Sequence, residues 1–292
     1  MIDSPSKDLK EALFQLSRLK KERPALTGPA DFFSEVLPGL FAEENRNRVP
    51  GITPEQARSK LADGIPLLRS EKVEIDRAQF QRRWLVIAAA VARHQDKESG
   101  QKIADVFRNN QLDIEEIVAT VLSDSPHDLH SRAESVGLPP DLTATVARLT
   151  LFPVLAQWNA DLAPLRSGAV WERGYCPTCG SWPLLGEFRG LEQTRWLRCG
   201  FCAAEWKVPR LFCPYCENRD HRSLGYLSVE GDGSKYRIDT CDSCRSYVKM
   251  LTTLAPLSCL QLLAADVATI HLDLAAAEKA YGASGKEKQE ND

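Results

Sequence analysis

Several features are missing from this sequence of 292 residues. The first 175 residues contain no cysteine, and the longest uninterrupted apolar run, from 84 to 92, has only nine residues. A helix that spans a membrane needs about 20 apolar residues. The polar N-terminus, with charges of both signs, also lacks the apolar segment and small-residue cleavage site of a secretory signal. We therefore expect a cytoplasmic protein without membrane insertion.

An excess of positive charge is also missing. The formal net charge of the chain is −3. Between residues 170 and 249, 12 Lys and Arg face 10 Asp and Glu, which gives +2. Two tetrathiolate sites holding divalent ions would add −2 each and bring that region to about −2. Proteins that grip nucleic acid neutralise phosphates with a basic surface, so we do not expect a nucleic-acid partner.

No catalytic constellation is visible. The sequence has no Gly-rich phosphate loop and no Gly-x-Ser-x-Gly nucleophile elbow. Residues 8–160 contain only three histidines, His94, His127 and His130, and no third ligand accompanies the last two. We therefore expect that the protein is not an enzyme.

Cysteine, by contrast, is concentrated after residue 175. Eight of the nine cysteines form four Cys-x-x-Cys pairs: Cys176/Cys179, Cys199/Cys202, Cys213/Cys216 and Cys241/Cys244. In a reducing compartment this pattern indicates metal binding rather than disulfides. The gaps between pairs are 19, 10 and 24 residues. The longer gaps allow a hairpin between two pairs, so we assign the first two pairs to one metal ion and the last two to a second.

An internal repeat supports this pairing. An aromatic residue, a Cys and a Pro begin both Tyr175–Cys179 and Phe212–Cys216, and a Lys follows five residues after Cys202 and Cys244. Units of about 35 residues have little core and depend on a metal for stability. Because four sulfurs leave no open coordination position, a structural role is favoured, and a redox or transient role stays open. Spacing alone does not choose between zinc and iron.

One pair permits another interpretation. Cys213-Pro214-Tyr215-Cys216 is also the active-site tetrapeptide of glutaredoxins, but a polar stretch without helical periodicity follows it. Dithiol exchange would need the motif between a strand and a helix, so we disfavour that function. The ninth cysteine, Cys259, lies in an apolar helical pattern and is expected to be a core thiol.

Two flanking regions have helical patterns. Residues 8–160 carry apolar stripes at helical spacing, with helix starts at Thr53-Pro54-Glu55-Gln56 and at Asp76 with Gln79. After the cysteines, apolar residues alternate at intervals of three and four from Leu260 to Tyr281, which predicts one C-terminal helix. In the second cysteine unit, strands at 224–229 and 236–239 are expected to flank a turn at 231–233.

The cysteine region resembles the FdhE family of formate dehydrogenase accessory proteins over about residues 170–282. The residues that carry the resemblance are Cys176 to Pro183, Arg198 to Cys202 with Glu205 and Trp206, Cys241 to Cys244 with Tyr247 and Lys249, Asp266 to Asp273, Glu278, and Tyr281 with Gly282. The helical part fits in length and character only. Two features depart from the pattern: His271 in place of an aliphatic residue, and the tail after Gly282.

The resemblance implies an α+β multidomain fold: an all-α N-terminal domain, two tandem rubredoxin-like, zinc-ribbon-type small β domains, and a C-terminal helix. We place the helical domain at 1–165, the four-cysteine units at 166–209 and 210–250, the helix at 251–281 and a disordered tail at 282–292. The resemblance also implies a cytoplasmic factor for maturation of respiratory formate dehydrogenase, which binds the catalytic subunit. It favours iron in both tetrathiolate sites, with zinc open. A rubredoxin-like electron carrier is the alternative function.

Overall fold

The chain before the cysteines is helical, as predicted for residues 8–160, and its first helix begins at Pro5. The computed structural model describes the whole chain except residues 1–4, 110, 124–125, 230, 233–234 and 283–292, so the predicted disordered tail lies almost entirely outside the described residues. The helices before the cysteines are α1 (Pro5–Glu22), η1 (Pro24–Leu26), α2 (Thr27–Leu40), α3 (Pro54–Ala62), α4 (Arg77–His94), α5 (Lys97–Arg108), α6 (Ile114–Ser123), α7 (Pro126–Ser135) and α8 (Pro140–Arg166). Two predicted starts are confirmed, since Thr53 and Gln56 form a capping box and Asp76 caps α4.

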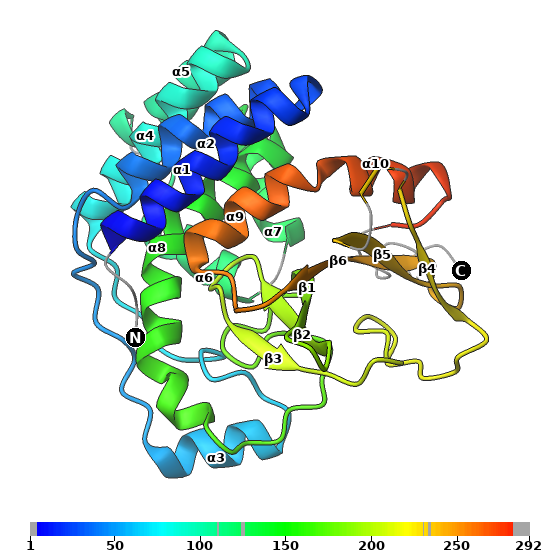
Figure 1. Cartoon of the computed structure of the whole chain (residues 1–292). Helices are drawn as coiled ribbons and strands as arrows, with labels where there is room; N and C mark the ends of the chain where they lie inside the picture. The colour runs from blue at the N-terminus through cyan, green and yellow to red at the C-terminus, as the bar shows by residue number, and fades with distance from the viewer. Residues whose placement is uncertain (1–4, 110, 124–125, 230, 233–234, 283–292) are drawn as a thin grey trace.

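The long helix α8 is the centre of this domain. Its 27 residues contact α3, α4, α6 and α7, and apolar side chains are buried on most of its circumference. Trp158 of α8 is fully buried and donates a hydrogen bond from Nε1 to the carbonyl of Asn47 at 3.1 Å. A helix that is apolar around most of its surface belongs inside a bundle, and Figure 1 shows α8 running through the helical half down to the cysteine region.

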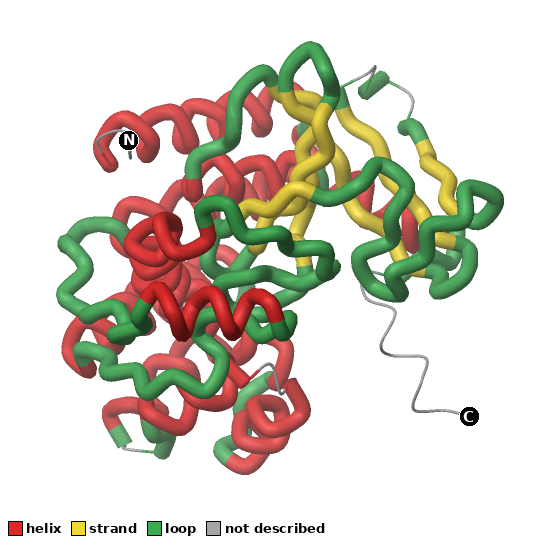
Figure 2. Tube along the Cα trace, turned by 90° about the horizontal axis from the view of Figure 1, so that it is seen from below, coloured by secondary structure: helices red, strands yellow, loops and turns green. Residues whose placement is uncertain are grey.

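The cysteine region forms one mixed sheet. Its strands are β1 (Pro183–Arg189), β2 (Thr194–Cys199), β3 (Glu205–Lys207), β4 (Leu224–Leu227), β5 (Tyr236–Cys241) and β6 (Ser246–Thr253). The order is β3-β2-β1-β6-β5-β4; β1 and β6 are parallel and the other neighbours antiparallel. The predicted pairing of the strands at 224–229 and 236–239 is confirmed by β4 and β5, while Gly233 of the predicted turn lies outside the described residues. The sheet lies beside the helical domain, as Figure 2 shows from another side.

The strand order shows how the internal repeat is built. Each unit is a knuckle, a two-stranded hairpin, a second knuckle and a third strand, so β1, β2 and β3 correspond to β4, β5 and β6. The units join where β1 pairs with β6. There, a Cβ on Gly186 would lie 2.5 Å from Met250 Sδ and 2.9 Å from the carbonyl oxygen of Trp196. Glycine at this position therefore permits the close approach of the strands that fuses the two units into one sheet.

The C-terminal segment differs from the single predicted helix. It forms α9 (Cys259–Ala268) and α10 (Ile270–Glu278), bent by 46°. The hydroxyl of Thr269, between them, donates to the carbonyl of Ala265 at 2.8 Å. Such side-chain bonds compete with the helical ladder and bend helices. Helix α9 packs on α1 and α2 of the helical domain, whereas α10 lies on β5 and β6 (Figure 1).

Among the described residues, no single helix is long and apolar enough to cross a bilayer. Only α9 and α10 taken together, which are bent relative to each other, have the length and composition of a span.

Candidate metal centres

The sheet brings the four predicted pairs together two by two, as the gap lengths predict. The first tetrad consists of Cys176, Cys179, Cys199 and Cys202, and the second of Cys213, Cys216, Cys241 and Cys244. In each tetrad one pair lies in the turn before the hairpin, and the other begins at the last residue of the hairpin's second strand. An antiparallel hairpin returns to where it started, so the second pair lies beside the first. Because β1 is parallel to β6, both tetrads lie at the end of the sheet where these two strands begin.

The sulfur geometry fits a tetrahedral ion. Four sulfurs about 2.3 Å from a zinc ion are about 3.8 Å apart. In the first tetrad, Cys176–Cys202 and Cys179–Cys199 have Sγ–Sγ distances of 3.5 Å. In the second, Cys213–Cys244 and Cys216–Cys241 are 3.6 and 3.7 Å apart, and all ligand atoms of a tetrad lie within 4.8 Å of one another. Each tetrad could therefore hold one metal ion; that the eight cysteines do bind metal stays a prediction.

A backbone feature that the sequence did not reveal is repeated in all four pairs. The residue directly after the second cysteine has a positive φ each time: Gly180 (87°), Ala203 (58°), Glu217 (58°) and Arg245 (57°). This conformation turns the chain so that an amide following the pair donates back to the carbonyl of its first cysteine, as Gly180 N–H does to Cys176 at 2.9 Å. Only the first pair has the glycine that favours such a turn, so no shared residue type predicts the turn in all four pairs.

Backbone and amide donors also point at the sulfurs. The N–H of Thr178 lies 3.4 Å from Cys176 Sγ, and that of Phe201 lies 3.3 Å from Cys199 Sγ. In the second tetrad, the side-chain amide of Asn218 lies 3.8 Å from Cys241 Sγ. Donors of this kind stabilise the thiolate over the thiol. Asn218 is thus a candidate supporting residue that cysteine spacing alone could not identify.

In each tetrad the pKa of one thiol is lowered, whereas burial raises the pKa of two others. Burial opposes ionisation of Cys176, but hydrogen bonds from the other three thiols lower its pKa well below the usual value. Burial, followed by the interaction with Cys176, raises the pKa of Cys199 and Cys202. Burial also opposes ionisation of Cys241, yet the Cys244 N–H and the Asn218 amide lower its pKa to about 7. Clustered thiols with one stabilised thiolate are a suitable donor set for a thiophilic cation, whose binding displaces the remaining protons.

The two tetrads differ in their surroundings. All four cysteines of the first are buried, at 0–3% exposure. The helical domain contacts the first knuckle directly. The N–H groups of Leu67 and Leu68 donate to the carbonyls of Pro177 and Thr178 at 2.9 and 2.8 Å. The Thr178 hydroxyl also lies 3.0 Å from Asn159 Oδ1 of α8. The first tetrad is thus part of the contact between the sheet and the helices.

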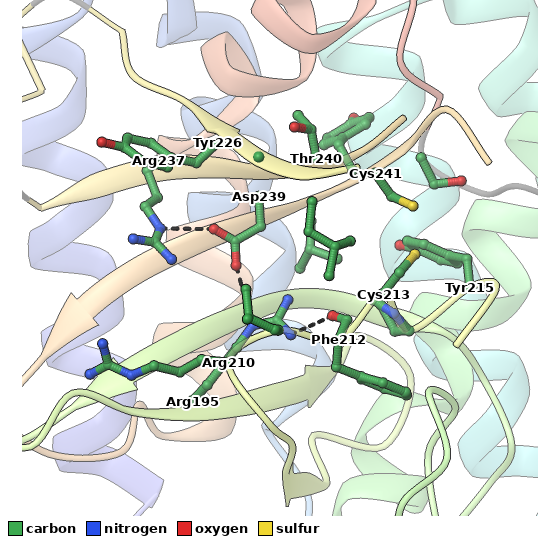
Figure 3. A pocket seen from close by; sticks show the side chains of 17 residues that line it. Arg195, Arg210, Phe212, Cys213, Tyr215, Tyr226, Arg237, Asp239, Thr240 and Cys241 are labelled. Atoms are coloured by element: carbon green, nitrogen blue, oxygen red, sulfur yellow. Dashed lines mark hydrogen bonds and ion pairs between the residues drawn. The ribbon is translucent and has the colours of Figure 1, made fainter. Parts of the chain in front are cut away.

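The second tetrad is partly open. Cys216 is exposed and Cys244 half-buried, while Cys213 and Cys241 are buried. A cavity of about 120 Å³ adjoins Cys213 and Cys241. Figure 3 shows Asp239 in this cavity between Arg195 and Arg237, with ion pairs of 3.2 and 2.8 Å.

Arg195 connects the first unit to the second tetrad. It projects from β2, and its guanidinium donates to the carbonyl of Phe212, directly before Cys213, at 2.7 Å. Burial lowers the pKa of Arg195 from its usual value, and Asp239 opposes this shift. A second connection is aromatic, since the rings of Trp182 and Tyr215 lie 5.4 Å apart between the two first knuckles.

Motif residues outside the cysteines, which carry part of the family resemblance, meet in one network. Lys249 of β6 is 4% exposed and donates to Asp266 of α9 at 2.6 Å and to Asp273 of α10 at 2.8 Å. The hydroxyl of Tyr247 donates to Asp273 at 2.7 Å. His271, which departs from the family pattern, also has a partner. Its Nε2 lies 2.6 Å from the buried Asp232, and Asp232 forms an ion pair with Arg23 as well. Both networks attach the C-terminal helices to the second unit.

Comparison with known proteins agrees with this architecture. Residues 175–210 match the family described as "FdhE, central domain", and residues 211–288 match "FdhE, C-terminal domain". A protein FdhE homolog from Pseudomonas aeruginosa is 39% identical over 135 residues, which are 42% of this chain and 43% of the relative. Protein FdhE from Escherichia coli O127:H6 is 33% identical over 132 residues, 43% of this chain and 41% of the relative.

Two further comparisons cover more of the chain. A homolog from Pectobacterium carotovorum is 29% identical over 227 residues, 73% of this chain and 68% of the relative. The crystal structure of the FdhE protein from Pseudomonas aeruginosa superposes with a TM-score of 0.65 over 97% of this chain and 94% of that one, at 23% identity, which shows the shared fold. The matches to the first two relatives span only about two fifths of their lengths.

Fold and site together define a tandem four-cysteine protein: a helical domain, a mixed sheet with two zinc-ribbon-like cysteine clusters, and C-terminal helices. The matches to both family domains and to the curated relatives then place it among known proteins. Residues 175–288 of the chain match the FdhE family, and the curated relatives that share this region are FdhE proteins.

Proposed function

We propose that this protein is an accessory factor required for the activity of respiratory formate dehydrogenase. The observation that carries the proposal is the pair of four-cysteine clusters on one sheet, within the two domains that match the FdhE family. In this role the protein acts on its partner by binding, in the cytoplasm, and not by catalysing a reaction itself. The partner is the catalytic subunit of the dehydrogenase.

The cysteine region is the proposed contact surface. Among the described residues, eight large apolar side chains are exposed, and five of them lie between 170 and 254: Val170, Leu191, Leu211, Tyr226 and Leu254. The cysteine region thus carries more of the exposed large apolar side chains than the rest of the described chain, which supports a protein contact there. The sheet also ends in two short edge strands, β3 and β4, whose unpaired backbone groups are available to a partner.

Each tetrad is proposed to hold one metal ion, through Cys176, Cys179, Cys199 and Cys202 in the first and Cys213, Cys216, Cys241 and Cys244 in the second. Iron is favoured because the family resemblance implies rubredoxin-like sites, and the sulfur spacing suits zinc equally. The ion would supply a cross-link between each hairpin and its knuckles, and iron would add a one-electron couple.

Co-purification under anaerobic conditions tests the proposal. Tagged protein from cells respiring formate should recover the catalytic subunit, and Cys241→Ser should abolish the recovery. Cys259→Ser is the matched control, because Cys259 belongs to neither tetrad and that variant should recover the subunit as the wild type does. In a strain that lacks the gene, formate dehydrogenase activity should fall and return with the wild type and with Cys259→Ser. Unchanged activity without the gene would refute the role.

A rubredoxin-like electron carrier is the second candidate function. The exposed Cys216 in the second tetrad favours it, since a carrier needs one metal close to its surface. The iron-loaded protein should then show reversible one-electron reduction in a redox titration. A protein that purifies with zinc alone and shows no redox couple would exclude this function and leave the binding role.

A further inference from the structure

The difference in burial between the two tetrads has a chemical consequence. A sulfur bound to a metal can be replaced only if an incoming donor reaches the ion or the sulfur itself. In the first tetrad all four cysteines are at most 3% exposed. Cys179 takes the position in the first unit that Cys216 takes in the second, since each is the second cysteine of its first knuckle. Cys179 is buried, whereas Cys216 is exposed.

The first tetrad is buried against the helical domain. The knuckle at 176–179 is hydrogen-bonded to segment 66–69 and to Asn159 of α8, and Arg148 of α8 lies 4.6 Å from the ring of the buried Phe201 in the second knuckle. The cysteines of the first tetrad belong to the main apolar core. Opening it would separate the sheet from the helical domain, and such an opening requires a large part of the stability of the protein.

The second tetrad can be approached without such an opening. Cys216 and Cys244 face its exposed side, and the cavity of about 120 Å³ lies against Cys213 and Cys241. Three arginines, Arg195, Arg210 and Arg237, line that cavity against one carboxylate, Asp239. Apart from the cysteines, the described lining therefore carries an excess of two positive charges. These charges offset the −2 of a metal-loaded tetrathiolate, so an anionic sulfur donor or chelator is not repelled from the site.

We propose that the second tetrad is the exchange-competent metal centre and that the first is a permanent structural one. The inference rests on the proposal that both tetrads bind metal. A small thiolate or chelator from solution forms a new bond to the ion while the bond to Cys216 breaks. The released Cys216 thiolate then takes a proton from water, and no atom changes its oxidation state. Cys216 is thus the sulfur at which ligand exchange begins.

The rate of metal release tests the proposal in the wild-type protein. Zinc-loaded protein with two ions per chain, measured by elemental analysis, is mixed with 4-(2-pyridylazo)resorcinol, whose absorbance reports released zinc. We expect two phases of one equivalent each, with rates that differ about tenfold or more, the ratio for a barrier difference of about 1.4 kcal/mol. A single phase of two equivalents would overturn the inference while leaving the metal sites intact. Protein that retains no zinc would overturn the metal sites themselves.

Alkylation assigns the phases to their centres. Brief treatment of the zinc-loaded protein with iodoacetamide, followed by peptide mass spectrometry, should modify Cys216 first and leave the first tetrad protected. Equal labelling of Cys179 and Cys216 would contradict the proposal. Cys216→Ala should lack the fast equivalent, and the matched variant Cys179→Ala should retain the fast equivalent at its wild-type rate. Because the labelling order is measured in the wild type, the test does not depend on how well the variants fold.

Discussion

Lys249 is the residue at which the second unit meets both C-terminal helices. Removing it leaves Asp266 and Asp273 without their cation. Breaking a fully buried ion pair typically costs about 3 kcal/mol or more, but these two carboxylates are 31% and 35% exposed, so water screens part of the loss. We therefore expect Lys249→Met to lower the free energy of unfolding by about 1–3 kcal/mol, measured by urea denaturation.

The repeat supplies a matched control for that substitution. Lys207 takes the same position in the first unit, five residues after Cys202, but lies exposed on the edge strand β3. Lys207→Met should therefore change stability by less than about 0.5 kcal/mol. Equal losses in the two variants would show that the buried network is not what stabilises this junction.

The pH dependence of the Lys249 contribution has a definite sign. Burial alone would lower the pKa of Lys249, but Asp266 and Asp273 outweigh it and raise the pKa above the usual value. A cation with a raised pKa contributes its full stability below its unfolded pKa, about 10.4, and loses it as the pH rises through the folded pKa. The stability difference between wild type and Lys249→Met should thus be constant between about pH 7 and 9 and shrink above about pH 10.5. A difference that shrinks already at neutral pH would contradict the assignment.

At the scale of the element, the knuckles depend on a left-handed residue after each second cysteine. Gly180 has φ +87°, and an added Cβ would lie 3.0 Å from Arg69 and 3.2 Å from Pro66. Forcing a side chain into this conformation costs about 1–2 kcal/mol. Gly180→Ala should lower the free energy of unfolding by that amount and speed metal loss from the first tetrad.

Gly51→Ala is the control for the knuckle, because a Cβ there would meet nothing within 4 Å and its φ is not left-handed. Its effect on unfolding by urea should stay within about 0.5 kcal/mol. If Gly180→Ala were equally neutral, the first knuckle would tolerate a side chain and the positive φ would not be a requirement of the turn.

The elements with local signals could be predicted from the sequence, and those that depend on distant partners could not. The caps at Thr53 and Asp76, the four cysteine pairs and the β4–β5 hairpin all follow from residues close in the chain. The pairing of β1 with β6 joins residues more than 60 positions apart, so no local pattern predicts it. The break at Thr269 was missed because apolar residues continue at helical spacing on both sides of it.

The difference in burial between the two tetrads could not be predicted from the sequence either. Their spacing and flanking residues are nearly the same, so the sequence predicts two equivalent sites. Burial of the first results from segment 66–69 and from Asn159, which lie about 110 and about 20 residues away from the knuckle that they cover. Contacts between domains, and not the cysteine motif, therefore decide which site faces solvent.

At the scale of the whole molecule, the two units of the continuous sheet differ in how closely they pack against the helical domain. The first tetrad belongs to the main apolar core together with residues of α2, α4 and α8. The second is attached through Arg195, the parallel pair β1–β6 and the network of Lys249. Loss of the first metal should therefore weaken the helical domain as well as its own unit, whereas loss of the second should leave the helices folded.

Thermal unfolding followed by helical circular dichroism tests this difference. Cys176→Ser removes one sulfur from the first tetrad, and Cys241→Ser one from the second. Each kcal/mol of lost stability lowers the midpoint of thermal unfolding by about 2–4 °C in a protein of this size. Cys176→Ser should lose a few kcal/mol of metal-linked stability. Its midpoint should therefore fall by about 10 °C. The midpoint of Cys241→Ser should fall by less than half as much, although that variant binds one metal ion fewer. Equal shifts would show that the sheet transmits the loss of either metal to the helices alike, and the second unit would then be as much a part of the core as the first.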